Sequence, residues 1–117
     1  MEVTRIFDLL DHYAALCPDK EDALAGKEGG IWKTYSTKEW VDNSHFISYG
    51  LMKLGIEKGD KIASITFNRP EWNFLDMGVQ QCGAIHIPIY PTISDTDYEY
   101  ILNHAEVKYV FVAGEDM

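Results

Sequence analysis

A chain of 117 residues has the size of one ordinary domain, and a hydrophobic content of 46% is sufficient for a packed core. Its 19 acidic and 10 basic residues give a formal net charge of -9, which would repel a phosphate backbone and attract an anionic membrane surface only weakly. The composition therefore argues against nucleic acid as a partner.

The first predicted element is a helix that Thr4 can cap and that Pro18 ends. Its apolar residues recur at helical spacing and predict one buried stripe, made of Ile6, Leu9, Leu10, Tyr13 and Leu16. Residues 23–25 and 31–35 are then expected to pair as a hairpin. The intervening Lys27-Glu28-Gly29-Gly30 tolerates the backbone angles of a tight turn.

A longer helix is predicted to begin at Ser36. Ser36 and Glu39 have the spacing of a capping box, and Gly55 ends the helix. One side is lined by Trp40, Ser44, Ile47, Leu51 and Leu54. We interpret this element as an amphipathic packing helix.

The pattern changes after the Gly59-Asp60 turn, where residues 62–67 have the length and content of a buried strand. Pro70 suits the first turn of a helix that Gly83 ends. Its apolar positions are Trp72, Leu75, Val79 and Cys82. In the strand that follows, one face is formed by Ile85, Ile87 and Ile89.

A third helix is expected to run to about His104 after a Ser94 cap that pairs with Asp97, with Ile93 and Tyr98 as a hydrophobic staple. Residues 109–113 form another continuous apolar strand. Alternating strands and helices with short connections are typical of a parallel sheet.

The sequence therefore predicts an α/β fold, a partial three-layer fold with a parallel βαβαβ unit over residues 61–113 preceded by helix, hairpin and helix. Residues 1–60 and 61–117 are interpreted as two parts of one larger amino-terminal domain. A parallel sheet normally has both faces covered, and this chain offers few helices for that role. We therefore expect the sheet to continue in further polypeptide.

Ligands of open parallel sheets gather at the carboxyl ends of the strands, which here are residues 68–69, residues 91–94 and the segment after Ala113. Arg69 could meet an anion, but it is also typical of a surface arginine beside a capping asparagine. For Thr92 and Ser94 we favour helix capping over phosphate binding. Asp95 and Asp97 are better explained by a helix amino terminus than by acid-base catalysis.

His86 interrupts an apolar strand, and we interpret it as a satisfied histidine at the sheet surface rather than a catalytic one. The remaining histidines lack the spacing of a zinc site, and the phosphate-loop, dinucleotide and nucleophile-elbow motifs are absent from the sequence. Cys17 and Cys82 are far apart and predict two reduced thiols rather than a disulfide framework or a zinc site. From the residues alone we assign no catalytic, cofactor-binding or metal-binding residue.

Three phrases carry a resemblance to a known superfamily: TYSTKEW at 34–40, FNRPEW at 67–72 and QQCGAIHIPIYPT at 80–92. In order and spacing they resemble the acyl-adenylate-forming enzymes, and LGIEKGDKIASI at 54–65 and YILNHAEVKYVFV at 100–112 resemble the connecting pieces of that family. The wording of FNRPEW and CGAIHIPIYPT is most similar to AMP-forming long-chain fatty acid CoA ligases.

The resemblance implies the amino-terminal fragment of a ligase that activates a fatty acid with ATP and Mg2+ and transfers it to coenzyme A. The family's phosphate-binding loop, adenine-binding segments, ribose-binding aspartate and catalytic lysine have no counterpart in this sequence. The chain alone is therefore expected to be inert and to bind no cofactor. The resemblance also implies that Tyr35 and Trp40 pack the hairpin onto its helix, and that Pro88, Pro91 and Thr92 shape a strand end near the active-site cleft.

Two alternatives stay open: a stand-alone flavodoxin-like binding or regulatory module, and a ligase of the same superfamily for another carboxylic acid. The first 13 residues do not resemble a secretory leader, and no apolar run has membrane-spanning length. We therefore expect a cytoplasmic protein without a transmembrane segment, with peripheral membrane association of the parent enzyme left open. An unfinished sheet edge also predicts self-association.

Overall fold

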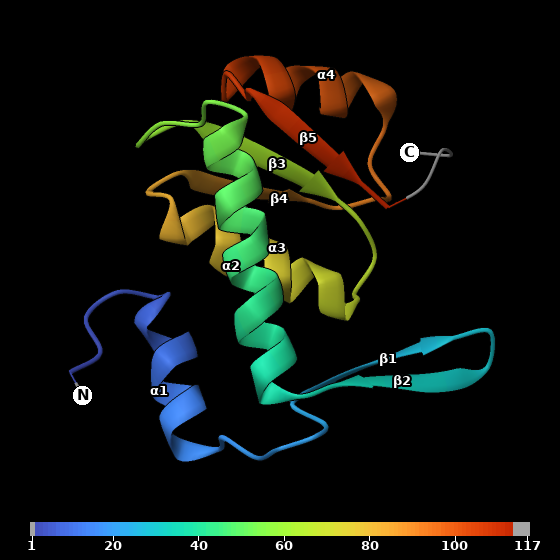
Figure 1. The fold of residues 1–117 in the computed structure, drawn as a ribbon. Helices are drawn as coiled ribbons and strands as arrows, with labels where there is room; N and C mark the ends of the chain where they lie inside the picture. The colour runs from blue at the N-terminus through green and yellow to red at the C-terminus, as the bar shows by residue number, and fades with distance from the viewer. Residues whose placement is uncertain (1, 114–117) are drawn as a thin grey trace.

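The computed structural model describes residues 2–113, in which a parallel sheet lies between two helical layers (Figure 1). The helices are α1 (Asp8–Leu16), α2 (Thr37–Lys53), α3 (Pro70–Gln81) and α4 (Asp95–His104). The strands are β1 (Leu24–Glu28), β2 (Ile31–Tyr35), β3 (Lys61–Ile65), β4 (Ile85–Ile89) and β5 (Tyr109–Val112). The expected order of elements is confirmed.

The central sheet has the order β4-β3-β5, and both strand pairs are parallel. In the register, Ser64 lies opposite Pro88 on one side and Phe111 on the other. The predicted βαβαβ unit is thus confirmed. Strand β3 ends at Ile65, two residues before the expected end at residue 67. The Ile65 carbonyl accepts the Ala113 N–H, and the chain then turns towards Pro70 at the start of α3.

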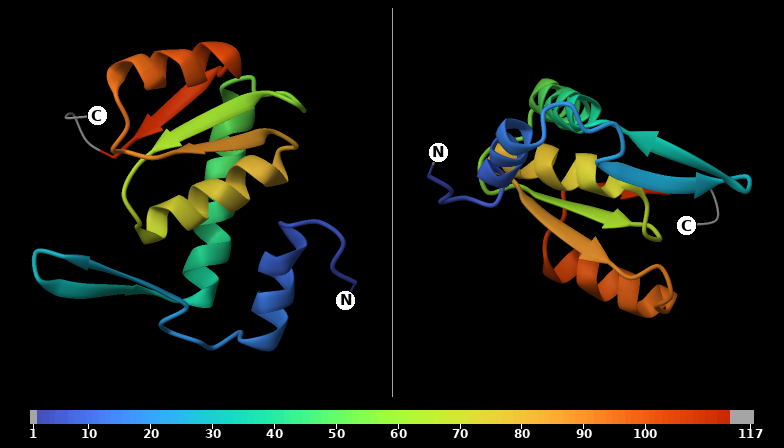
Figure 2. Two further views of the ribbon diagram at one scale, coloured as in Figure 1. Left: turned by 180° about the vertical axis from the view of Figure 1, so that it is seen from behind. Right: turned by 90° about the horizontal axis from the view of Figure 1, so that it is seen from below.

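Two hydrophobic cores lie on opposite faces of the sheet. The first core lies beneath α2 and α3 and includes Ile62 of β3. Its buried residues are Leu51, Ile56, Ile62, Leu75, Val79 and Ala84. Ala63 and Ile65 join the second, together with residues of α4 and its flanking turns. Side chains of a strand alternate between faces, so β3 supplies both cores. The view from below shows α3 and α4 on opposite sides of the sheet (Figure 2).

Helix α2 begins as predicted. The Ser36 hydroxyl accepts the Glu39 N–H at 3.1 Å, and the Glu39 carboxylate accepts the Ser36 N–H at 3.1 Å, which completes the capping box. The chain leaves the helix at Gly55, whose φ of 88° favours glycine. Of the predicted apolar side, Ser44 and Leu51 are buried, whereas Leu54 is exposed.

Helix α1 corrects two expectations. Thr4 does not cap it; instead, the Asp8 carboxylate accepts the N–H groups of Thr4 and Arg5 at 3.2 and 3.0 Å. Only Leu10 of the expected stripe is fully buried, and the exposed members are Ile6, Leu9 and Leu16. The reason is that α1 packs chiefly against a single helix, α2, so one line of contact is enough to bury Leu10.

The predicted hairpin is confirmed, although β1 begins at Leu24 and extends to Glu28. Gly29 and Gly30 form its turn with φ values of 56° and 80°, the left-handed backbone that a two-residue hairpin turn requires. The expected packing of Tyr35 and Trp40 is wrong. Tyr35 meets Phe74 of α3 with ring centroids 5.0 Å apart, and Trp40 meets Tyr13 of α1 at 5.4 Å.

Candidate functional site

Three cavities meet where β3, β4 and β5 end, and Thr66 lines all of them. We name them by position. The α3 cavity, of about 270 Å³, is lined by residues of α2, β3, α3 and β5. The β4 cavity, of about 490 Å³, lies beside the turn after β4, and the hairpin cavity, of about 280 Å³, lies beside β1. This is the edge where ligands of open parallel sheets bind.

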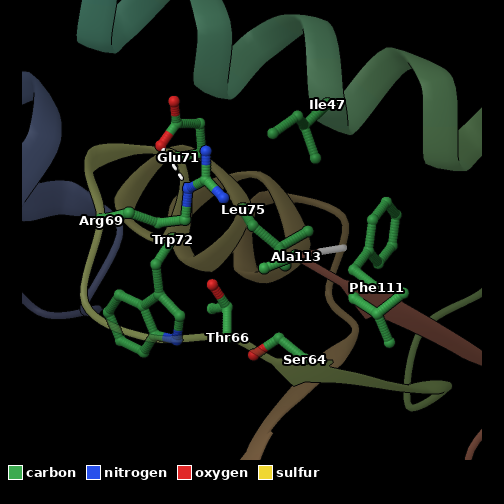
Figure 3. Close-up of a pocket in the computed structure, with 10 residues that line it drawn as sticks. Ile47, Ser64, Thr66, Arg69, Glu71, Trp72, Leu75, Phe111 and Ala113 are labelled. Atoms are coloured by element: carbon green, nitrogen blue, oxygen red, sulfur yellow. Dashed lines mark hydrogen bonds and ion pairs between the residues drawn. The ribbon is translucent and has the colours of Figure 1, made fainter. Parts of the chain in front are cut away.

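The α3 cavity is mostly apolar. Figure 3 shows Trp72 and Leu75 of α3, Ile47 of α2 and Phe111 of β5 around it. Ser64 of β3 and Thr66, which directly follows that strand, contribute hydroxyl groups. Pro70 at the first turn of α3 starts the helix that places Trp72 and Leu75 here. An apolar wall with a few convergent polar groups is typical of small-molecule sites.

Arg69 and Glu71 close one side of this cavity as an ion pair, with Arg69 Nε donating to Glu71 Oε2 at 2.8 Å (Figure 3). The Tyr35 hydroxyl donates to the other Glu71 oxygen at 3.3 Å, which ties the hairpin to α3. Burial acts to raise the pKa of Glu71, but the hydrogen bond from Arg69, together with weaker favourable interactions, outweighs burial and lowers it. The pKa of Arg69 is raised, chiefly by the same hydrogen bond.

A second polar arrangement lies between the sheet and α3. Ser64 Oγ is 2.8 Å from His86 Nε2, and His86 Nδ1 is 2.8 Å from Asp76 Oδ1. Gln80 Nε2 also donates to Asp76 Oδ1, at 3.0 Å. The Trp72 ring packs against the His86 imidazole, with the ring centroids 5.3 Å apart. The His86 side chain is only 3% exposed, so both ring nitrogens are satisfied by protein groups.

Sequence reasoning placed His86 at the sheet surface but missed both of its partners. Ser64 and His86 lie on neighbouring strands and on one face of the sheet, because Ile62 is the register partner of His86. The sequence did contain a signal for the Ser64–His86–Asp76 group. Each of two apolar strands carries a polar residue, and Asp76 lies between the apolar positions 75 and 79 of the covering helix.

The other candidates remain apart. Arg69 occupies the N-cap position of α3 without a side-chain cap bond, so the expected asparagine cap at residue 68 is wrong. The Ser94 hydroxyl accepts the Asp97 N–H at 3.2 Å, which confirms helix capping. Asp95 and Asp97 lie in the first turn of α4, as expected. Thr92 is exposed and lines the β4 cavity with residues that include Asn68, Pro88 and Pro91.

Within residues 2–113, no group of three or more histidine, cysteine or acidic side chains is placed to hold a metal ion. Cys17 and Cys82 are both free thiols. None of the described helices combines the length and apolarity needed to cross a bilayer. Among the side chains that line the α3 cavity, Arg69 is paired with Glu71 through Nε.

Comparison with known proteins finds one enzyme family and relatives that are named as CoA ligases or synthetases. The sequence profile described as "AMP-binding enzyme" matches residues 10–117. Fatty acyl-CoA synthetase A of Dictyostelium discoideum is 30% identical over 96 residues, which cover 82% of this chain and 14% of that protein. 4-Hydroxybutyrate–CoA ligase 2 of Metallosphaera sedula is 37% identical over 79 residues, or 68% of this chain and 14% of the relative. Several further relatives are named long-chain-fatty-acid–CoA ligases.

Among solved structures, the fatty acid AMP ligase of Legionella pneumophila superimposes with a TM-score of 0.80 at 16% sequence identity. The match covers 94% of this chain and 20% of that one. At this identity the likeness concerns the fold. The chain spans 14%, or about one seventh, of the length of the curated relatives named above.

Proposed function

Because this chain belongs to the AMP-binding enzyme family, we propose that it is the amino-terminal part of an ATP-dependent ligase that joins fatty acids to coenzyme A. The observation that carries the proposal is the family match over residues 10–117. The fatty-acid assignment is supported by relatives named fatty acyl-CoA and long-chain-fatty-acid–CoA ligases. The activity is proposed for the longer polypeptide, since the chain spans 14% of these relatives.

In the proposed reaction, a fatty acid carboxylate oxygen attacks the α-phosphate of ATP and pyrophosphate leaves. The thiolate of coenzyme A then attacks the carbonyl carbon of the acyl adenylate, and AMP leaves. Bound Mg2+ would neutralise charge on the transferring phosphate. We propose that the nucleotide and metal ligands lie in the rest of the polypeptide, in keeping with the lack of a group of three or more histidine, cysteine or acidic side chains placed to hold a metal ion within residues 2–113.

This chain would contribute one wall of the ligase cleft. The turns after β3 and β4 bring Thr66, Asn68 and Thr92 to the β4 cavity, at the edge where a parallel sheet binds its ligands. The Arg69–Glu71–Tyr35 contact holds the first of these turns against the hairpin. We propose that the β4 cavity faces the cleft and that Pro88 and Pro91 fix its shape.

The test uses the chain and the longer protein separately. Isothermal titration of the 117-residue chain with Mg-ATP should show no binding, and tight magnesium-dependent binding would contradict the assignment of the nucleotide site elsewhere. The protein expressed from the complete reading frame should form AMP from ATP only when fatty acid and coenzyme A are both present. A complete reading frame without a downstream Thr/Ser/Gly/Lys-rich loop would instead favour a flavodoxin-like module.

A ligase for a short hydroxy acid is the second candidate, since the 4-hydroxybutyrate–CoA ligase is 37% identical over the matched residues. AMP formation with palmitate and with 4-hydroxybutyrate, at equal concentrations, separates the two. Faster turnover of palmitate supports the fatty acid assignment. Turnover of 4-hydroxybutyrate alone would replace it.

The proposal includes a cytoplasmic location and self-association of the isolated chain. Among the described strands, β5 pairs only with β3, and its exposed residues are Tyr109, Val110, Phe111 and Val112. Unpaired strand edges recruit other strands. Size-exclusion chromatography at increasing concentration should therefore show a dimer or larger species, and a monomer at every concentration would contradict this part of the proposal.

A further inference from the structure

We propose that Ser64 is a base-activated nucleophile that accepts acyl and phosphonyl groups from small reagents entering the cavities beside it. Ser64 and His86 are within hydrogen-bond reach, and Asp76 orients the histidine from the other side. The groups come from β3, β4 and α3, far apart in the sequence. Nucleophile, base and orienting carboxylate are recognised by this geometry and not by their order in the chain. The reactivity is separate from the proposed ligase reaction.

In the neutral imidazole of His86, its two hydrogen-bond partners determine which nitrogen carries the proton. The Asp76 carboxylate can only accept, so the His86 Nδ1–H donates to it. His86 Nε2 then presents its lone pair to the Ser64 hydroxyl, which donates. The Gln80 amide holds the same Asp76 oxygen, and the Trp72 ring packs against the imidazole. The histidine is thus held in the tautomer that can take the Ser64 proton.

Access to Ser64 is through cavities, because the residue is only 2% exposed. It lines both the α3 cavity, of about 270 Å³, and the β4 cavity, of about 490 Å³. The first volume lies just below, and the second in the lower half of, the range of about 300–1,000 Å³ for small-molecule pockets, so small reagents are expected to enter and bulky ones to be excluded.

Stabilisation of an oxyanion is the weaker part of the arrangement. β3 is the central strand, so its amides are engaged in pairing with β4 and β5. Arg69 lines the α3 cavity with Ser64 and, among the described residues, its hydrogen bond to Glu71 uses only Nε, which leaves its terminal N–H groups to meet developing negative charge. Without a pair of backbone donors, we expect slow stoichiometric modification rather than rapid turnover.

With p-nitrophenyl acetate, Ser64 Oγ attacks the carbonyl carbon while its proton passes to His86 Nε2. The bond between the carbonyl carbon and the phenolate oxygen then breaks, the proton passes to the phenolate, and acetyl-Ser64 and p-nitrophenol are formed. With diisopropyl fluorophosphate, Ser64 Oγ attacks phosphorus and fluoride leaves with the proton. No oxidant, metal or further reactant is required.

The experiment incubates the folded 117-residue chain with diisopropyl fluorophosphate, follows the adduct by intact mass and locates it by tandem mass spectrometry. We expect one adduct, on Ser64. The Asp76→Asn variant keeps the size of the side chain but removes its charge, and it should slow the modification about 100-fold, the lower range of a general-base contribution. Asp76→Glu should recover part of the rate.

Ser48→Ala is the matched control, because Ser48 is also buried but donates to the Gly78 carbonyl and, among the described residues, has no hydrogen bond to a histidine. Its modification rate should equal that of the unaltered chain. Nitrogen NMR of the His86 ring should show a protonated Nδ1, and Asp76→Asn should change that signal. An adduct elsewhere, no adduct on the folded chain, or equal rates for the unaltered chain and Asp76→Asn would overturn the proposal.

Discussion

A β-carbon at Gly78 would lie 2.6 Å from Ile47 Cγ2, closer than real side chains approach one another. The Ser44 carbonyl oxygen would be 2.9 Å away, so α2 and α3 cross at a point where only glycine fits. Gly78→Ala should therefore destabilise the chain by about 1–3 kcal/mol through overpacking. Urea unfolding followed by circular dichroism measures this change.

The matched control is Gly50→Ala, in α2, where an added β-carbon meets nothing within 4 Å. It should be neutral or should stabilise by up to about 1 kcal/mol, because alanine is the better helix former. Equal effects of the two substitutions would contradict the tight crossing at Gly78.

The Asp8 carboxylate should make stability depend on acid pH. The side-chain hydrogen bond from Arg5, with the N–H groups of Arg5 and Thr4, holds its pKa far below the usual value of 3.8. Because the folded pKa is depressed, its contribution is fully present above the unfolded value and is lost as pH falls towards the folded one. Asp8→Asn should thus destabilise the chain at pH 7, and its difference from the unaltered chain should shrink below about pH 4.

Thermal unfolding of both proteins across pH 2–7 gives this comparison. Asp11→Asn, on the same helix, serves as the control for removal of one negative charge. A gap between Asp8→Asn and the unaltered chain that stays constant with pH would show that the carboxylate charge does not matter.

The capping box at the start of α2 should be needed for stability. Ser36→Ala removes the acceptor of the Glu39 N–H and should lower the free energy of unfolding by about 1 kcal/mol. Ser36→Gly should cost less, since glycine is tolerated at this position. The order can be measured by urea denaturation; alanine and glycine variants of equal stability would count against the cap.

Cys82 should react slowly with alkylating reagents. Burial raises the pKa of its thiol, and the thiol donates to the Ser48 carbonyl at 3.3 Å. Less thiolate is then present at a given pH, and the thiolate is the reacting form. In a Cys17→Ser variant, iodoacetamide should modify Cys82 much more slowly in buffer than in urea, with Cys82→Ser reporting on Cys17. Equal rates in buffer and urea would contradict this shielding.

Much of the fold could be predicted because its signals are local. Ser36 with Glu39, Gly29 with Gly30, and Pro70 each act within a few residues, and the structure places each in its expected turn or cap. The alternation of strands with helices along residues 61–113 then predicted the parallel sheet. Local patterns could not say which apolar residues of α1 are buried. Leu10 is buried and Leu9 exposed, because neighbouring residues point to different sides of a helix and α1 packs chiefly against α2.

The candidate site was predicted as a place but not as a set of contacts. The carboxyl ends of the strands do form cavities, and Thr92 lines one of them. The Asp76–His86 pair depends on how α3 lies over β4, which spacing along the sequence does not determine. Tyr35 was expected on α2 for the same reason, whereas the path of the hairpin brings it to Phe74.

Strand β3 couples the stability of the two hydrophobic cores, since it contributes side chains to both faces of the sheet. Ile62 points to one side and Ala63 to the other, and neither can leave its surroundings unless the strand separates from both neighbours. Melting of α4 from the sheet should therefore weaken the packing of α2 and α3 as well. Calorimetry would then record one cooperative transition for the sheet and its covering helices, in place of two independent ones.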